Sequence, residues 1–137
     1  MRFIVYQDLN FLEAPYSGGA QLTDAEMYKE GLRRGYDMAL ITPQNWQNTP
    51  VYEEDVLILS NITRFDPGRF EKVPNKIIVF THDYLFCRYR LFYPRLEKCI
   101  KACAYKGPWE KLYKMASLNI FLSPCTTKCT KRYSATQ

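Results

Sequence analysis

The sequence predicts an open α/β fold, a mostly parallel sheet of about five strands flanked by helices. Short apolar runs recur along the chain and alternate with helical patterns or compact connections. Most of these runs are apolar at nearly every position, which is typical of strands buried on both faces. The chain has 137 residues, 47% of them hydrophobic, which suits one globular domain. We assign residues 1–133 to this domain and residues 134–137 to a C-terminal tail.

Five runs are expected to form the sheet, in the order 3-2-1-4-5 when strands are numbered along the chain. In such sheets, ligands bind beyond the carboxyl ends of the strands. The loop 7–20, the turn after Thr42, residues 60–64 and residues 81–84 are expected at that edge. The five runs are RFIVY (2–6), MALIT (38–42), VLILS (56–60), KIIVFT (76–81) and LNIFLS (118–123).

A helix is predicted between the first two strands. Thr23 and Glu26 have the spacing of a capping box, which would place the helix start at Thr23. Alternatively, the helix starts earlier, at the pair Gly18 and Gly19. Gly35 suits the position just after the helix end, where a left-handed conformation is common. The apolar face is expected to contain Leu22, Ala25, Tyr28 and Leu32.

A second helix is predicted before the last strand, with Pro108 at its first position. Asp66, Pro67 and Gly68 mark a turn between the third and fourth strands. Residues 124–133 are compatible with the start of a final helix. The apolar face of the second helix is expected to contain Trp109, Leu112, Tyr113 and Ala116.

Charge is distributed unevenly along the chain. Residues 1–83 hold 8 Lys/Arg and 12 Asp/Glu, a net charge of −4, whereas residues 84–137 hold 11 and 2, a net charge of +9. The basic block indicates an anionic partner, which could be nucleic acid, phospholipid or a phosphorylated substrate. The alternative is a solvated basic helix face. The block begins with Arg88, Arg90, Arg95, Lys98 and Lys101.

The N-terminus, MRFIVYQDLN, has one basic residue and a short alternating apolar run, which indicates a first strand and not a signal peptide. No apolar run reaches the ~18 residues that a membrane span needs. We therefore expect a cytoplasmic protein, peripheral to the inner face of a membrane if the basic block binds phospholipid.

Five cysteines lie in the last 51 residues. Their odd number, without a secretory signal, favours reduced thiols over a disulfide framework. Their spacings differ from the usual C-x2-C of structural zinc sites, so we expect no metal, with a zinc site as the minor alternative. They are Cys87, Cys99, Cys103, Cys125 and Cys129.

Two features indicate a ligand site at the carboxyl edge of the sheet. Gly18 and Gly19 lie between a first strand and a helix, where free backbone N–H groups can bind phosphate. His82 is the only histidine and directly follows a buried strand. A glycine pair in a loop is often only a turn, and a lone histidine is often structural.

Three stretches together resemble the N-terminal domain of retaining family-4 glycosyltransferases. GGAQLTDAEMYKEGLRRGYDMALITP resembles their glycine loop, helix and following strand. FTHDYLFC (80–87) resembles the HDYWF-C segment of a subset of these enzymes, and NIFLSP (119–124) resembles the strand before the last helix of that domain. The matches occur in order and span most of residues 2–133.

The resemblance implies a Rossmann-like domain, half of a GT-B architecture, that acts in glycosyl transfer such as polysaccharide biosynthesis. Gly18, Gly19 and Ala20 would lie against the phosphates of a nucleotide-sugar donor, and His82 would be the catalytic residue near the donor sugar. Asn61, Asp83 and Tyr84 are the remaining candidate substrate-binding residues at this edge. The acceptor would be a saccharide or a lipid-linked sugar, and no metal or other cofactor would be needed.

The chain departs from the family in stopping at KRYSATQ, before the second Rossmann-like domain that binds the nucleotide. We therefore expect it to be a piece of a longer enzyme, a domain that works with a partner, or a chain that is no longer a catalyst. Alone it should not transfer sugar, because half of the transition-state stabilisation would be missing. The competing interpretations are a non-catalytic α/β module that binds a nucleotide or phosphate, and a nucleic-acid-binding module, which we disfavour because no known nucleic-acid motif is present.

Overall fold

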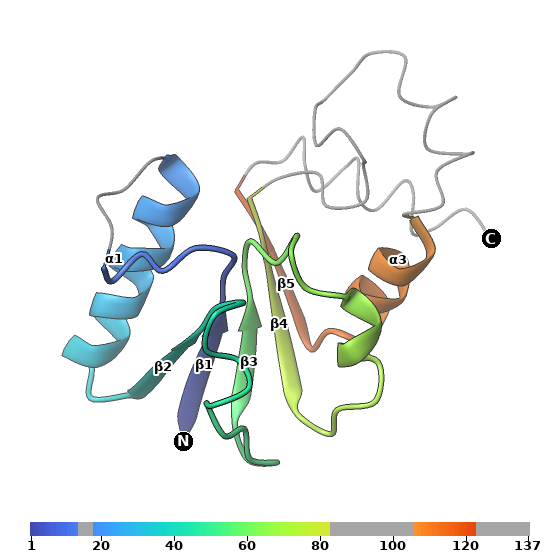
Figure 1. Ribbon diagram of the computed structural model, residues 1–137, viewed down its shortest axis with the longest axis horizontal. Helices are drawn as coiled ribbons and strands as arrows, with labels where there is room; N and C mark the ends of the chain where they lie inside the picture. Colours follow the sequence, from blue (N-terminus) through green and yellow to red (C-terminus); the bar gives the residue numbers. More distant parts are fainter. Residues whose placement is uncertain (14–17, 83–105, 123–137) are drawn as a thin grey trace.

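The computed structural model describes residues 1–13, 18–82 and 106–122, and these form a parallel sheet with helices on both faces (Figure 1). The predicted α/β fold is thereby confirmed. All five strands are parallel, and their order is β2-β1-β3-β4-β5. The elements are β1 (Arg2–Tyr6), α1 (Gly19–Arg33), β2 (Asp37–Ile41), β3 (Val56–Leu59), the 3-10 helix η1 (Pro67–Phe70), β4 (Lys76–Thr81), α3 (Lys106–Met115) and β5 (Leu118–Phe121).

The expected strand order 3-2-1-4-5 gives the wrong position for β3. That order puts β3 outside β2, whereas β3 lies between β1 and β4, with Val56 in register with Phe3 on one side and Lys76 on the other. All four residues of β3 are buried, so this strand needs a neighbour on each side. β2 begins with exposed Asp37 and suits an edge. The chain direction across the sheet therefore switches between β1 and β3, which defines the ligand crevice of an open sheet.

The two helices pack on opposite faces of the sheet. Ile4 and Val5 are neighbours in β1, and their side chains belong to two different buried clusters. The Val5 cluster lies under α1 and includes Ala25 and Tyr28 of that helix. The Ile4 cluster lies under α3 and η1 (Figure 1).

The start of α1 is at Gly19, with Gly18 as the N-cap residue, so the second of the two predicted starts is the observed one. Thr23 caps nothing, because its hydroxyl donates a hydrogen bond to the carbonyl of Gly19 at 2.9 Å, inside the helix. The predicted apolar face is only half correct. Ala25 and Tyr28 are buried, but Leu22 and Leu32 are about half exposed.

The end of α1 is a Schellman motif built on Gly35, as predicted. Gly35 has φ +80°, a left-handed conformation that glycine adopts without strain. Its N–H donates to the carbonyl of Leu32, and the N–H of Tyr36 donates to that of Gly31. Gly31 also packs closely, since an added Cβ would lie 2.6 Å from the sulfur of Met38.

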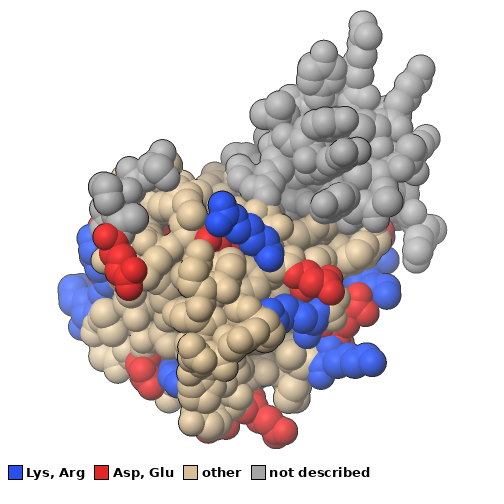
Figure 2. All heavy atoms as spheres, in the orientation of Figure 1, with Lys and Arg blue, Asp and Glu red and all other residues tan. Residues whose placement is uncertain are grey.

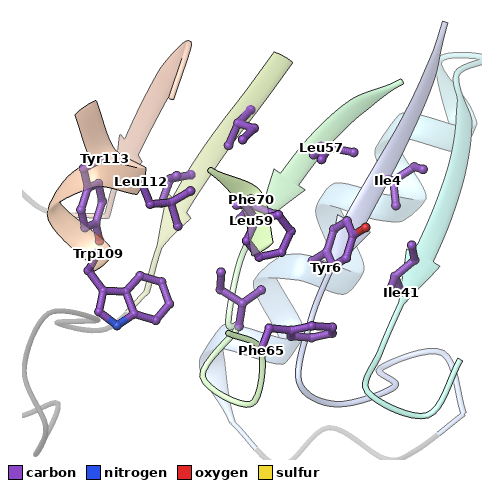
Figure 3. Packing of buried hydrophobic residues seen from close by; sticks show 13 residues of the cluster. Ile4, Tyr6, Ile41, Leu57, Leu59, Phe65, Phe70, Trp109, Leu112 and Tyr113 are labelled. Carbon is purple, nitrogen blue, oxygen red and sulfur yellow. The ribbon is translucent and has the colours of Figure 1, made fainter. Parts of the chain in front are cut away.

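Five aromatic residues pack together with aliphatic residues in the core under α3 (Figure 3). The ring of Tyr6 meets Phe65 and Phe70 edge to face, with centroid distances of 5.5 and 5.1 Å. α3 contributes the face predicted for it, with Trp109, Leu112 and Tyr113 buried and Ala116 packed against them.

Two details of this half differ from expectation and one agrees. α3 begins at Lys106, so Pro108 is its third residue, still within the first turn, where no intrahelical N–H bond is required. β5 is not buried on both faces, since Leu118 and Ile120 are substantially exposed. The predicted turn at Asp66 is present, and its carboxylate caps η1 by accepting the N–H of Gly68 at 2.9 Å.

Candidate functional site

Polar side chains follow three neighbouring strands at the switch between β1 and β3. Gln7 comes directly after β1, Ser60 directly after β3 and His82 directly after β4. Because the strands are parallel, these residues lie at one edge of the sheet. α1 packs on one face of the sheet and contributes Asp24, which bonds to all three of these residues.

The carboxylate of Asp24 is the centre of this cluster, which we call the Asp24 network: Asp24, Gln7, Ser60 and His82. Ser60 Oγ donates to Asp24 Oδ2 at 2.6 Å, and Gln7 Nε2 donates to the same oxygen. His82 Nε2 lies 2.8 Å from Asp24 Oδ1. The Asp24 side chain is fully buried, so hydrogen bonds from three strand ends replace the water that a carboxylate needs.

A second carboxylate fixes the loop after β3. Asp8 accepts the backbone N–H of Thr63 at 2.9 Å and that of Arg64 at 2.8 Å, and it also accepts the Thr63 hydroxyl. The N–H of Asp8 donates to the carbonyl of Asn61 at 2.7 Å. The loop from β3 is thereby tied to the end of β1, across the switch point.

His82 is enclosed on several sides. Its side chain is only 4% exposed, and its ring centroid lies 4.4 Å from that of Phe80. Nε2 is held by Asp24, whereas buried Nδ1 has no hydrogen-bond partner among the described residues. Oδ1 of Asn61 is also buried and has no hydrogen-bond partner among the described residues. Two buried polar atoms at this edge therefore keep hydrogen-bonding capacity unused within the described part of the chain.

The N-terminus of α1 lies in the same half of the molecule. Gly18 is extended and offers no capping side chain, so no cap bond covers the first N–H groups of the helix. A Cβ added at Gly19 would meet nothing within 4 Å, and one added at Gly18 would lie 3.0 Å from the side-chain oxygen of Gln21. Packing within the described residues therefore does not require glycine at position 19. Ala20 is the second residue of the helix.

The remaining predicted site residues lie outside the described residues. They are Asp83 and Tyr84, the basic residues Arg88, Arg90, Arg95, Lys98 and Lys101, and all five cysteines. Within the described part, Figure 2 shows acidic and basic side chains interspersed over the coloured area of the face in view. No helix of that part is long and apolar enough to cross a membrane.

The arrangement differs from a nucleophilic triad. Ser60 and His82 both bond to Asp24, on different oxygens, so the hydroxyl is held by the acid and not by the base. What the cluster supplies is a fixed imidazole bonded to Asp24, in the second turn of a helix whose start carries positive dipole charge. Such a site is suited to binding and orienting a polar or anionic ligand.

The sequence interpretation overlooked the residue at the centre of the site. Asp24 was not among the candidate site residues, and Gln7 and Asp8 were assigned only to the loop 7–20. One signal was available, because Asp24 immediately precedes Ala25 on the face that Tyr28 continues one turn later. A carboxylate that borders a buried face requires partners, and polar residues at the carboxyl ends of strands could supply them.

Comparisons of this chain with protein-family models, with curated proteins and with solved structures find no significant match.

Proposed function

We propose that the chain is the acceptor-side domain of a glycosyltransferase, which holds the diphosphate and sugar of a nucleotide-sugar donor at the β1/β3 switch. The observation that carries the proposal is the bond between Asp24 Oδ1 and His82 Nε2. It joins the histidine after β4 to the N-terminal half of the helix that follows the glycine pair. The two features that the sequence marked as ligand-binding are thereby linked by one side chain.

The start of α1 has the chemistry for a diphosphate. Its first N–H groups have no acceptor in the helix, and the helix dipole favours an anion there. No side chain at Gly18 or Gly19 obstructs the approach. Exposed Arg64, whose backbone Asp8 holds in place, adds a positive charge at the same sheet edge.

His82 has the chemistry for a sugar hydroxyl. An imidazole whose Nε2 is occupied retains Nδ1 for one more hydrogen bond. Transfer of the glycosyl group to an acceptor hydroxyl requires the sugar to be held while the diphosphate leaves, and positioning by such bonds lowers the barrier. The acceptor would be a saccharide or a lipid-linked sugar, as the resemblance implies. A second domain, in the same chain or in another, would supply the remaining contacts to the nucleotide.

The first test measures donor binding by this chain with UDP-glucose, GDP-mannose and inorganic diphosphate as probes, using calorimetry or NMR titration. We expect weak binding that Gly19→Val reduces, because a branched side chain would cover the N–H groups. Gly107→Val is the matched control, since Gly107 is the second residue of α3 and an added Cβ there would meet nothing within 4 Å among the described residues. The control should bind the probes like the parent chain.

The second test measures sugar transfer after fusion to a donor-binding GT-B domain. His82→Ala should lower kcat more than it raises KM, because the lost contact would act on the reacting sugar. Gly19→Val is assayed in the same fusion. Equal sugar transfer by the parent, Gly19→Val and His82→Ala would show that the glycine pair is only a turn and that His82 is only a packing residue. Donor binding without any transfer by the fusion would favour the non-catalytic nucleotide-binding module.

A further inference from the structure

The two oxygens of Asp24 have different partners. Oδ2 receives two hydrogen bonds, from the hydroxyl of Ser60 and from the side-chain amide of Gln7. Among the described residues, Oδ1 bonds only to Nε2 of His82, at 2.8 Å. The carboxylate is fully buried, so neither oxygen has water as an alternative partner.

The orientation of the Gln7 amide is fixed independently. Its Oε1 accepts the backbone N–H of Asp8 at 2.8 Å, so this end must be the oxygen. The other end is then the NH2 group, which donates to Asp24 Oδ2. Asp24 Oδ2 thus acts as an acceptor toward both Gln7 and Ser60, which leaves Oδ1 for His82.

From this geometry we infer that Asp24 is a positioning residue that fixes His82 as the Nε2–H tautomer. A carboxylate oxygen only accepts, so the ring nitrogen that faces it must carry the proton. Nδ1 of the neutral ring is then bare and accepts a hydrogen bond. Nδ1 is buried and has no partner among the described residues, so it can accept from a donor outside them, and we take that donor to be a hydroxyl of a ligand. The choice of a sugar hydroxyl as this donor rests on the proposed function.

An isosteric substitution should reverse the tautomer. In Asp24→Asn, the amide oxygen is expected at the Oδ2 position, where Gln7 and Ser60 both donate. The NH2 group then occupies the Oδ1 position and faces His82 Nε2. That nitrogen must become an acceptor, so the proton moves to Nδ1, and the ligand would meet a donor where the parent offers an acceptor.

The experiment uses the full chain with 15N-labelled histidine, because a single histidine gives one pair of ring nitrogen signals. Two-bond 1H–15N spectra on the high-pH plateau report which nitrogen is protonated. We expect Nε2–H in the parent and Nδ1–H in Asp24→Asn. Ser60→Ala is the control, since it removes a donor from Oδ2 and leaves Oδ1 unchanged, and it should keep Nε2–H.

The spectra without ligand decide the tautomer. Nδ1–H in the parent chain, or an unchanged tautomer in Asp24→Asn, would overturn the inference. If Asp24→Asn does not fold, the parent and Ser60→Ala spectra can still overturn the inference, because Nδ1–H in either of them would contradict it.

A titration with UDP-glucose and GDP-mannose decides the ligand. We expect the bare Nδ1 signal to shift on binding, and Asp24→Asn to bind about tenfold more weakly, which corresponds to about 1.4 kcal/mol. An Nε2–H tautomer combined with an Nδ1 signal that neither compound moves would overturn the sugar as its partner and the proposed function, while leaving the role of Asp24 in fixing the ring intact.

Discussion

The two faces of the sheet are packed in different ways. Under α3 and η1, thirteen buried side chains form one apolar cluster that includes five aromatic rings (Figure 3). Under α1, the cluster has seven members, and the helix buries the carboxylate of Asp24 beside Ala25 and Tyr28. The α3 face therefore contributes mostly apolar burial. The α1 face uses part of its buried surface for the polar Asp24 network.

The difference separates stability from positioning. Apolar burial stabilises in proportion to the area removed from water, whereas a buried charge must first recover its lost hydration. The Asp24 network therefore adds little net stability, but it fixes the orientation of the His82 imidazole. The α3 face also holds a buried polar contact, between the hydroxyls of Thr81 and Tyr113 at 3.0 Å, but both groups are neutral. We expect the α3 face to contribute more of the stability of the fold and the α1 face to position the candidate site.

The largest effect should come from breaking the α3 face. Phe70 is 1% exposed and packs edge to face on Tyr6, so Phe70→Ala leaves a cavity that the rigid sheet cannot close. We expect a loss of about 3–5 kcal/mol in the free energy of unfolding, measured by urea denaturation. Phe70→Leu retains most of the volume and should lose much less. A loss under about 1 kcal/mol for Phe70→Ala would contradict the assignment of stability to this face.

The next effect comes from the α1 face, where shape and charge can be separated. Asp24→Ala leaves buried donors of Gln7, Ser60 and His82 without an acceptor, and we expect a loss of about 2–3 kcal/mol. Asp24→Asn should lose less than about 1 kcal/mol, because the tautomer of His82 can change so that every bond is kept. Chemical denaturation of both variants measures the contrast.

Glu26 provides the matched control for Asp24 on the same helix. Its side chain is 63% exposed and pairs with Lys29, so Glu26→Ala should stay within about 0.5 kcal/mol of the parent. Equal losses for Asp24→Ala and Asp24→Asn would show that the charge itself, and not the set of hydrogen bonds, carries the contribution.

The same division explains how far the sequence could lead. Apolar periodicity is set by burial, so the strands and the α3 face were predicted from it, whereas the helix end at Gly35 was predicted from the left-handed conformation that is common there. The wholly apolar VLIL of β3 already demanded a central position, and giving it neighbours on both sides would have corrected the strand order.

The site was less accessible to such reasoning. Its residues come from four separate elements, and no local pattern connects Asp24 to Ser60, 36 positions away, or to His82, 58 positions away. The glycine pair and the histidine were visible because each is locally unusual. The carboxylate that joins them became visible only when the strand order put the ends of β1, β3 and β4 side by side.

A pH experiment sharpens the comparison from the α3 side. Burial raises the pKa of Tyr113 to about 12, although the hydrogen bond with Thr81 opposes the shift. The folded-state value lies above the unfolded value of about 10, so this stability is fully present below pH 10 and is lost as the pH rises toward 12. By pH 11 the loss should be about 1–2 kcal/mol.

Tyr113→Phe isolates that contribution. It cannot ionise, so its stability should fall less steeply between pH 10 and 12 in urea titrations at each pH. Some dependence should remain, because burial also raises the pKa of Tyr6 and of Tyr28. Parallel curves for the parent and Tyr113→Phe would mean that the Tyr113 hydroxyl reaches water in the folded state.

The smallest effect concerns the start of α1, at the edge of the polar face. A capping box at Thr23 would make Thr23→Ala cost about 1 kcal/mol. The hydroxyl instead bonds the Gly19 carbonyl within the helix and is exposed, and such a bond slightly disfavours the helix. Alanine also has the higher helix propensity, by a few tenths of a kcal/mol. We therefore expect Thr23→Ala to be neutral or slightly stabilising in thermal unfolding. A loss of about 1 kcal/mol would move the helix start to Thr23 and leave the N–H groups beside Gly18 and Gly19 outside the helix, where its dipole could not assist a diphosphate.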